Sequence, residues 1–179
     1  FGFGLIGLSA CQSDAPAPAE KVTLPVANKA NYWYQGKAEI SSYSVTQERY
    51  GELREGGQVM VFVSEDFSAK KQVKLDAEPA ADDARVPILK LNTIRRFQTG
   101  IYDYTLMQSV FTGMDIGAGR TLKTTTTVQD WCGHVFTQFN AEKDGYRVRS
   151  FSYFESEGDA DILVKPALLE DELWTLLRL

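Results

Sequence analysis

The chain of 179 residues is 44% hydrophobic and 24% charged, with 14 glycines, six prolines and two cysteines. This length and composition suit one globular domain with a continuous core, and they exclude a disordered protein, a collagen-like repeat and a disulfide-stapled miniprotein. The formal net charge of −5 argues against nucleic acid as a partner, because phosphate recognition needs clustered Lys and Arg. A single histidine leaves little for acid–base catalysis near neutral pH.

Residues 1–11 are an apolar run that ends in small residues and Cys11. The run is too short to cross a bilayer, which takes about 20 apolar residues, but it fits the end of a secretion signal. Leu8-Ser9-Ala10-Cys11 looks like a bacterial lipobox, so we predict cleavage before Cys11, acylation of its thiol and attachment to a membrane. The alternative is that residues 1–11 form a buried strand or helix of the domain. Because neither an initiator Met nor a basic segment precedes Phe1, we expect a signal peptide truncated at its start.

Residues 12–30 are predicted to be a tether between the membrane and the domain. The segment 12–20 is rich in Ala and Pro and has almost nothing to bury, which is typical of an extended linker. The residue after the lipobox cysteine is Gln12 rather than the Asp that retains enteric lipoproteins in the inner membrane, so the outer membrane is expected. Whether the domain faces the periplasm or the outside stays open. With Cys11 acylated, Cys132 has no cysteine left for an intramolecular disulfide.

A single β-rich domain is predicted over residues 31–179. Period-two runs of β-branched and aromatic residues predict eight strands, at roughly 31–49, 57–65, 70–76, 87–97, 101–111, 120–130, 132–140 and 145–155. Turn signals fall at 55–57, 117–119 and 143–145. The fold class is therefore mainly β, an antiparallel meander that forms an open or half β-barrel or a strongly curved sheet.

The last segment changes to a helical pattern. Pro166 and the acids that follow it suit a first helical turn, and apolar residues recur at Leu169, Leu173, Leu176 and Leu177. We predict a short amphipathic helix that covers one mouth of the curved sheet. No capping residue ends it, so we expect a domain that is truncated at its C-terminus.

The most unusual string is Trp131-Cys132-Gly133-His134, which holds the lone histidine and the remaining thiol. On a strand, Cys132 and His134 would share a face, which makes them weak candidates for half of a zinc site or for a nucleophilic Cys–His pair. Packing around a bulge at Gly133 is the favoured interpretation. We predict no resident metal, no cofactor and no catalytic residue, since the chain has no Walker loop, no Gly-x-Ser-x-Gly elbow and no His-Glu-x-x-His motif.

Two sets of charged residues are weak candidates for ligand sites. Acids alternate from Glu155 to Asp161, but Gly158 and Pro166 do not match the positions that an EF-hand loop requires, so a solvated acidic turn is preferred to a calcium site. Arg147 and Arg149 share one strand face and can meet an acidic ligand, although charged side chains on a wet face are the default.

Several longer strings carry a resemblance to a known family. They are Tyr32–Ile40, Gln47–Glu55, Lys71–Lys74, Thr99–Tyr102, Gln129–His134 and Ser152–Asp159. Together they resemble Bacteroidota lipoproteins that carry the name "septum formation inhibitor Maf", over about residues 31–179. Members usually continue past their Leu-Trp-Thr-x-x-Arg helix, which implies a longer chain here. True Maf proteins are cytoplasmic α/β nucleotide pyrophosphatases with a Ser- and Arg-rich substrate loop, and this chain has neither that loop nor an alternating strand–helix pattern. The resemblance therefore implies an exported lipoprotein and supplies no catalytic residue.

The function that these observations favour is non-enzymatic. We expect a lipid-anchored cell-envelope protein that binds an apolar or amphiphilic ligand in a concavity lined by Phe62, Tyr104 and Phe136, or that binds another envelope protein. The alternative is a hydrolase with converging carboxylates, including the nucleotide pyrophosphatase that the family name implies. The two differ in whether the structure shows an apolar hollow or a cleft of clustered acids.

Overall fold

The computed structural model describes residues 32–114 and 121–179. Cys11, the predicted signal residues 1–11, the tether 12–30 and the predicted turn at 117–119 lie outside the described residues. None of the helices in the described part of the chain has the length and hydropathy that a membrane span requires.

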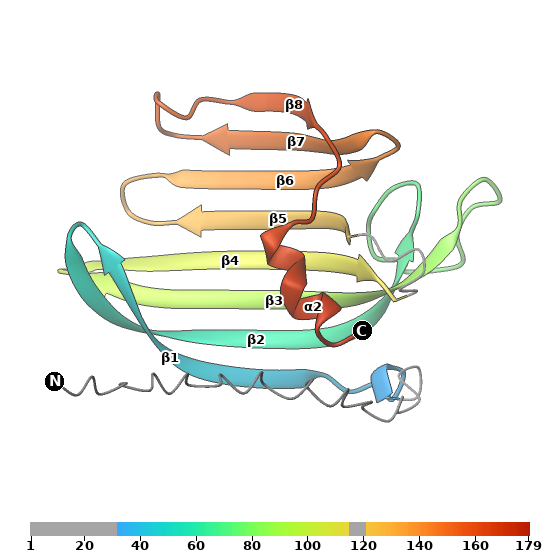
Figure 1. The fold of residues 1–179 in the computed structure, drawn as a ribbon, viewed down its shortest axis with the longest axis horizontal. Helices are drawn as coiled ribbons and strands as arrows, with labels where there is room; N and C mark the ends of the chain where they lie inside the picture. Colours follow the sequence, from blue (N-terminus) through green and yellow to red (C-terminus); the bar gives the residue numbers. More distant parts are fainter. Residues whose placement is uncertain (1–31, 115–120) are drawn as a thin grey trace, which may run out of the picture.

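Eight antiparallel strands form one sheet, and each strand pairs with its neighbour in the sequence (Figure 1). The strands are β1 (Glu39–Arg49), β2 (Glu52–Ser68), β3 (Arg85–Thr99), β4 (Tyr102–Gly113), β5 (Thr121–Gln129), β6 (His134–Glu142), β7 (Gly145–Ser152) and β8 (Ala160–Val164). The sheet is not closed, because β1 and β8 lie at opposite ends of the strand order. The predicted mainly β antiparallel meander is confirmed.

One predicted strand is wrong, one strand was missed, and the strand predicted at 31–49 begins only at Glu39. Residues 70–76 form a loop that contributes one isolated bridge, between Phe67 and Lys74. This loop contains Gln72 in the left-handed region at φ 52°, far from the backbone angles of a strand. The eighth strand is instead β8, a run of five residues behind an acidic turn. The sequence pattern does not indicate β8, because the strand is short and the acidic residues before it are typical of a long solvated loop.

The first hairpin also turns at a different place from the predicted one. The predicted turn at 55–57 lies inside β2, and the chain reverses at Tyr50 and Gly51, which have φ values of 58° and 74°. Two successive residues with positive φ suit a two-residue hairpin whose twist matches that of its strands. The predicted turn at 143–145 is confirmed, since β6 ends at Glu142 and β7 begins at Gly145.

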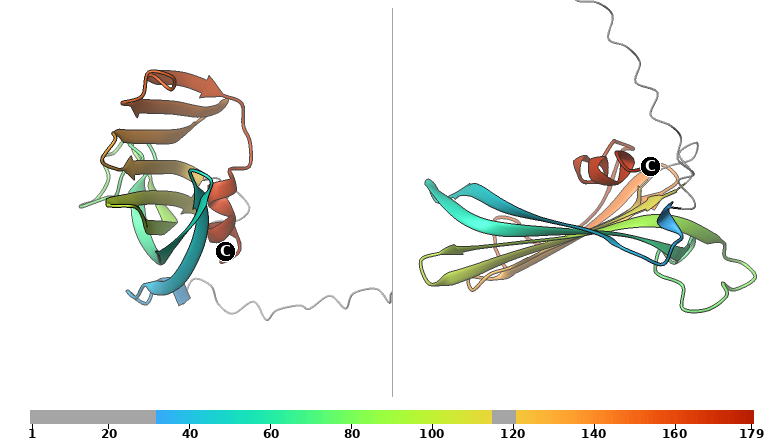
Figure 2. Two further views of the ribbon diagram at one scale, coloured as in Figure 1. Left: turned by 90° about the vertical axis from the view of Figure 1, so that its left-hand side faces the viewer. Right: turned by 90° about the horizontal axis from the view of Figure 1, so that it is seen from below.

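The C-terminal segment crosses one face of the sheet, which we call the helix face (Figures 1 and 2). It consists of the 3₁₀ turn η1 (Glu170–Glu172) and the helix α2 (Leu173–Leu176). Beneath and beside it the main hydrophobic core contains Trp33, Met60, Phe62, Leu89, Leu91, Val110 and Leu179. Register places these strand residues on one face, because Phe62 pairs with Leu91, and Leu91 pairs with Val110.

The helix is shorter than predicted and packs through a different face. Thr175 and Glu172 are buried, whereas Leu173 and Leu177 are 42% and 77% exposed. Polar contacts cause this orientation: the Thr175 hydroxyl lies 2.7 Å from that of Thr112, which lies 2.9 Å from that of Thr121. Of the predicted leucine stripe, Leu173 and Leu177 therefore face solvent, whereas Leu169 and Leu176 are partly buried.

Arg178 fixes the other end of this segment. Its guanidinium lies 2.7 Å from the Glu39 carboxylate and 3.7 Å from the centre of the Phe62 ring. Glu39 belongs to the edge strand β1, and Phe62 belongs to β2. The C-terminal segment thus contacts β1, β2, β3 and β4, and it closes the hydrophobic core over only one part of the helix face.

Candidate functional site

The three residues that we predicted to line one concavity do not come together. Phe62 is fully buried in the core beneath Arg178. Phe136 pairs with Thr127 and Phe151, and the alternation of β6 places it on the face opposite the helix. Tyr104 lies on the helix face, beyond the part that α2 covers. Of the three, Tyr104 is the residue that lines a cavity described below.

That cavity exists because the first hairpin separates from the sheet at Gly56. β1 and β2 stay paired down to Arg49 and Glu52, but β2 pairs with β3 only from Gly56 onward. Beyond this point the hairpin bends toward the side that carries α2 (Figure 2). Gly56 permits the close approach, because a Cβ there would lie 2.3 Å from the backbone oxygen of Arg96.

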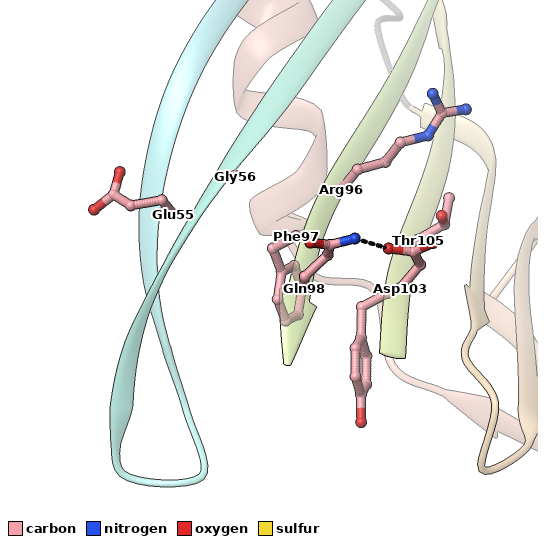
Figure 3. Close-up of a pocket in the computed structure, with 8 residues that line it drawn as sticks. Glu55, Gly56, Arg96, Phe97, Gln98, Asp103 and Thr105 are labelled. Carbon is pink, nitrogen blue, oxygen red and sulfur yellow. Dashed lines mark hydrogen bonds between the residues drawn. The ribbon is translucent and has the colours of Figure 1, made fainter. Parts of the chain in front are cut away.

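Two cavities lie beside this fork, the first lined mainly by side chains of the face opposite α2 and the second on the helix face, and we call the second the hairpin cleft. The first has a volume of about 660 Å³ and is lined by Glu55, Gly56, Arg96, Phe97, Gln98, Asp103, Tyr104 and Thr105. Figure 3 shows Glu55 on the hairpin across the gap from Phe97 and Gln98 on β3. The second has about 290 Å³ and shares Phe97 and Tyr104 with the first.

The second cavity combines an apolar floor with a charged rim. Phe97, Tyr104, Leu106, Val128, Val135 and Phe154 supply the apolar part, while Gln47, Glu48, Arg49, Asp130 and Glu157 supply the polar part. The rim comes from three separate places, the end of β1, the turn between β5 and β6, and the loop between β7 and β8. Ligand sites in proteins have this character, with mostly apolar walls and a few polar groups that orient the ligand.

Contacts between the hairpin and β4 hold the cleft in shape. The hydroxyls of Tyr50 and Tyr104 lie 3.0 Å apart, and the Phe97 and Tyr104 rings stack with centres 5.1 Å apart. The Arg49 guanidinium lies over both tyrosine rings, 4.7 Å from the centre of Tyr50 and 5.5 Å from that of Tyr104. The hydrogen bond with Tyr50 raises the pKa of the Tyr104 phenol, and burial raises it further, so this phenol stays protonated at neutral pH.

The carboxylates around the cleft are engaged in backbone turns. Glu48 accepts a hydrogen bond of 2.9 Å from the Gly51 amide, and Asp130 accepts bonds from the amides of Cys132 and Gly133 at 2.8 and 2.9 Å. Glu157 accepts a bond of 2.6 Å from the Ser152 hydroxyl. Each acid therefore stabilises a local turn, and this is a structural role that does not require a substrate.

Cys132 and His134 are exposed in and after the turn between β5 and β6. No group of three or more His, Cys, Asp or Glu side chains that could hold a metal ion occurs in residues 32–114 and 121–179. In the acidic run, Asp159 accepts a bond from the Ser152 amide, and Asp161 lies 3.5 Å from both Arg147 and Arg149. These acids close the loop between β7 and β8 and pair with the neighbouring strand.

Sequence reasoning missed most of the cleft. The alternating pattern identifies Leu106, Val128 and Val135 only as strand residues, and no local pattern shows that the hairpin leaves the sheet beside them. One signal was present: Gly56 and Gly57 lie inside β2, ahead of its run of valines, and glycine inside a strand often marks a close backbone approach. Comparison with known protein families, with curated proteins and with solved structures finds no match to the chain.

Proposed function

We propose that this protein is a lipid-anchored, non-catalytic binding protein of the cell envelope, and that the hairpin cleft takes an amphiphilic ligand. The observation that carries the proposal is the apolar floor beside a charged rim. Leu106, Val128, Val135 and Phe154 are only partly buried, so an acyl chain or ring seated on them would remove apolar area from water. Removing such area contributes about 25 cal/mol per Å².

The rim indicates the charge of the ligand's head group. Glu48, Asp130 and Glu157 place three carboxylates around the second cavity, against the single guanidinium of Arg49. A cationic or neutral head group suits this balance better than an anionic one. The ligand class we infer is therefore an amphiphile with a short apolar part and a cationic or neutral head.

Engagement of the carboxylates supports a binding role over the alternative of a hydrolase. A general acid or base must reach the proton that it transfers, whereas Glu48, Asp130 and Glu157 each accept bonds from turns of the chain. A protein partner remains the second candidate. The face opposite α2 exposes apolar side chains, among them Ile40, Val59, Met107, Phe151 and Leu163, and a contiguous exposed apolar patch marks an interaction surface.

Binding is tested with three amphiphiles that share one octyl chain and carry a trimethylammonium, a maltoside or a sulfate head, each titrated calorimetrically below its micelle concentration. We expect the cationic and neutral compounds to bind more tightly than the sulfate. Leu106→Gln is expected to weaken binding about tenfold, because the floor loses apolar area. Leu163→Gln on the opposite face is the control and leaves affinity unchanged. Equal weakening by both variants, or no heat with any amphiphile, contradicts the proposal.

The membrane anchor is tested separately. The protein expressed from its complete gene in a Gram-negative host is expected to incorporate labelled palmitate and to fractionate with the outer membrane. Cys11→Ser removes the thiol that accepts the lipid, so label and membrane association are both lost. Label that persists in Cys11→Ser contradicts the predicted lipidation site without affecting the assignment of the cleft.

A further inference from the structure

A further cavity of about 320 Å³ lies on the face opposite α2, and we call it the lysine pocket. The residues that matter to the argument are Lys70, Lys71, Gln72, Lys123, Asn140 and Arg149. Register assigns the face: Lys123 pairs with Phe111 and Asn140, whereas the neighbouring pair Val110 and Thr124 belongs to the helix face. The pocket is therefore separate from the hairpin cleft, and it does not depend on the proposed function.

The loop between β2 and β3 is fastened over this part of the sheet. Gln72 adopts φ 52°, and its side-chain amide donates to the Ala141 carbonyl at 2.7 Å and accepts from the Asn140 amide at 2.7 Å. The Lys123 ammonium donates to the Gln72 carbonyl at 3.3 Å. A left-handed backbone in a residue other than glycine, held by three bonds from another part of the sheet, indicates a preorganised wall.

The charges in the pocket are incompletely neutralised. In the described part of the chain, no carboxylate lies within ion-pair distance of Lys71 or Lys123, while Lys70 pairs with Asp82 and Arg149 lies 3.5 Å from Asp161. Burial lowers the pKa of Lys123, which is the expected effect on an ammonium without a nearby carboxylate. Glu142 is the one acid among the described residues that line the pocket, and it pairs with Arg147 at 3.3 Å.

We propose that the lysine pocket binds the oxyanion group of a phosphate- or sulfate-bearing molecule. Four cationic side chains reach it from three elements, the loop after β2, the strand β5 and the strand β7. A tetrahedral oxyanion offers acceptor oxygens in several directions, so it can receive bonds from ammonium groups that approach from different sides. The net charge of −5 makes general attraction of anions weak, so binding depends on this local concentration of lysines.

The first test is a titration of the protein with inorganic phosphate and with sulfate, followed by NMR of the Asn140 and Gln138 side-chain amides. We expect saturable shifts with a dissociation constant below about 1 mM. Lys123→Met and Lys71→Met are each expected to weaken binding about tenfold, because a charge-assisted hydrogen bond is lost. Both variants should fold, since neither lysine is in an ion pair within the described residues, and Lys71→Met also leaves the bond between Lys123 and the Gln72 carbonyl in place. Lys165→Met, which removes the same charge outside the pocket, leaves the affinity within about twofold.

Vesicles then identify the source of the oxyanion. Co-sedimentation with phosphatidylglycerol vesicles that is lost in both pocket variants, without co-sedimentation with phosphatidylcholine, assigns the site to an anionic lipid head group. Saturable phosphate binding without vesicle binding assigns it to a soluble phosphate- or sulfate-bearing molecule. Absence of saturable binding by wild-type protein overturns the proposal, as does a loss in Lys165→Met equal to that in the two pocket variants.

Discussion

The helix face has two halves that share the strands β3 and β4, and they differ in how they are covered. Under α2, Phe62, Leu91 and Val110 are fully buried, and buried hydroxyls and an arginine hold the cover in place. Farther along β3 and β4, Phe97 and Tyr104 face the hairpin cleft, whose floor includes the partly buried Leu106. The first half is a filled core, and the second is an apolar surface that is only partly buried.

A polar belt separates these halves. Thr93 pairs with Gln108, Gln108 with Thr126, and Thr126 with Thr137, so a polar row crosses the helix face from β3 to β6. This row lies between the core pair Leu91 and Val110 and the cleft-floor pair Leu106 and Val128. Burial of polar side chains is favourable only where hydrogen-bond partners are available, so the apolar core does not extend across it. The cleft is therefore bounded on one side by a row of polar side chains in regular strands and on the other side by the fork at Gly56.

The largest expected difference between the two halves is in the free energy of unfolding, when one leucine in each half is replaced by alanine. Leu91→Ala creates a cavity in the filled core and is expected to lower the free energy of unfolding by about 3 kcal/mol. Leu106→Ala removes a partly exposed side chain and is expected to cost about 1 kcal/mol. Urea denaturation of both variants measures the difference. Equal losses would mean that the cleft floor is packed as tightly as the core.

The fork is tested by two neighbouring glycines. Gly56→Ala places a Cβ against the Arg96 carbonyl and the Phe97 side chain, so we expect a loss of about 2 kcal/mol together with a weaker amphiphile affinity. At Gly57 the nearest atom to an added Cβ would be 3.9 Å away, so Gly57→Ala is the matched control and stays within about 0.5 kcal/mol. Thermal unfolding and calorimetry compare the two. A Gly56→Ala variant as stable as Gly57→Ala would show that the fork is not held by close approach.

The cover over the filled half is tested by Thr175→Val, which keeps the shape of the side chain but removes its hydroxyl. The Thr112 hydroxyl loses a bond of 2.7 Å, and the Glu172 carbonyl loses one of 2.8 Å. We expect the free energy of unfolding to fall by about 1.5 kcal/mol. Relative to the wild type, amide hydrogen exchange should become faster in residues 170–179 and change less in the strands. Thr127→Val on the opposite face is the control. Unchanged exchange in Thr175→Val would show that the leucines, not the hydroxyls, hold the helix.

The smallest expected effect on stability comes from the contact between the Tyr50 and Tyr104 hydroxyls, which holds the cleft in shape. The hydrogen bond with Tyr50 raises the pKa of the Tyr104 phenol, so the folded protein holds this proton more tightly than the unfolded chain. The resulting stability is present below the ordinary tyrosine pKa of about 10 and is lost as the pH rises through the folded value. Tyr50→Phe is expected to lower the Tyr104 pKa and reduce this alkaline loss, as measured by phenolate absorbance and by denaturation at several pH values. If Tyr104 titrates identically in the wild type and in Tyr50→Phe, the contact between the two hydroxyls is absent in solution.

Alternating residues such as those of β2 and β5 were enough to predict an open antiparallel meander, because period-two patterns with one wet face have few other solutions. Local pattern could not show which element each face would meet. The leucines of the last segment have helical spacing, yet Thr175 is buried while Leu173 and Leu177 are exposed, because the Thr175 partner Thr112, which in turn contacts Thr121, comes from a strand far along the chain. Likewise, Phe62 and Phe136 lie in similar strand patterns but on opposite faces, and only the register of the strand pairings between them decides this.

Methyl NMR of the wild-type protein with octyltrimethylammonium tests the assignment of the cleft most directly, because it observes both halves of the helix face in one experiment. We predict saturable shifts at the methyl groups of Leu106, Val128 and Val135, which line the cleft. The methyl groups of Leu89, Leu91 and Val110, which lie in the filled core, should not shift. Shifts that are confined to Val59, Met107 and Leu163 on the opposite face would contradict this assignment and place the binding surface there.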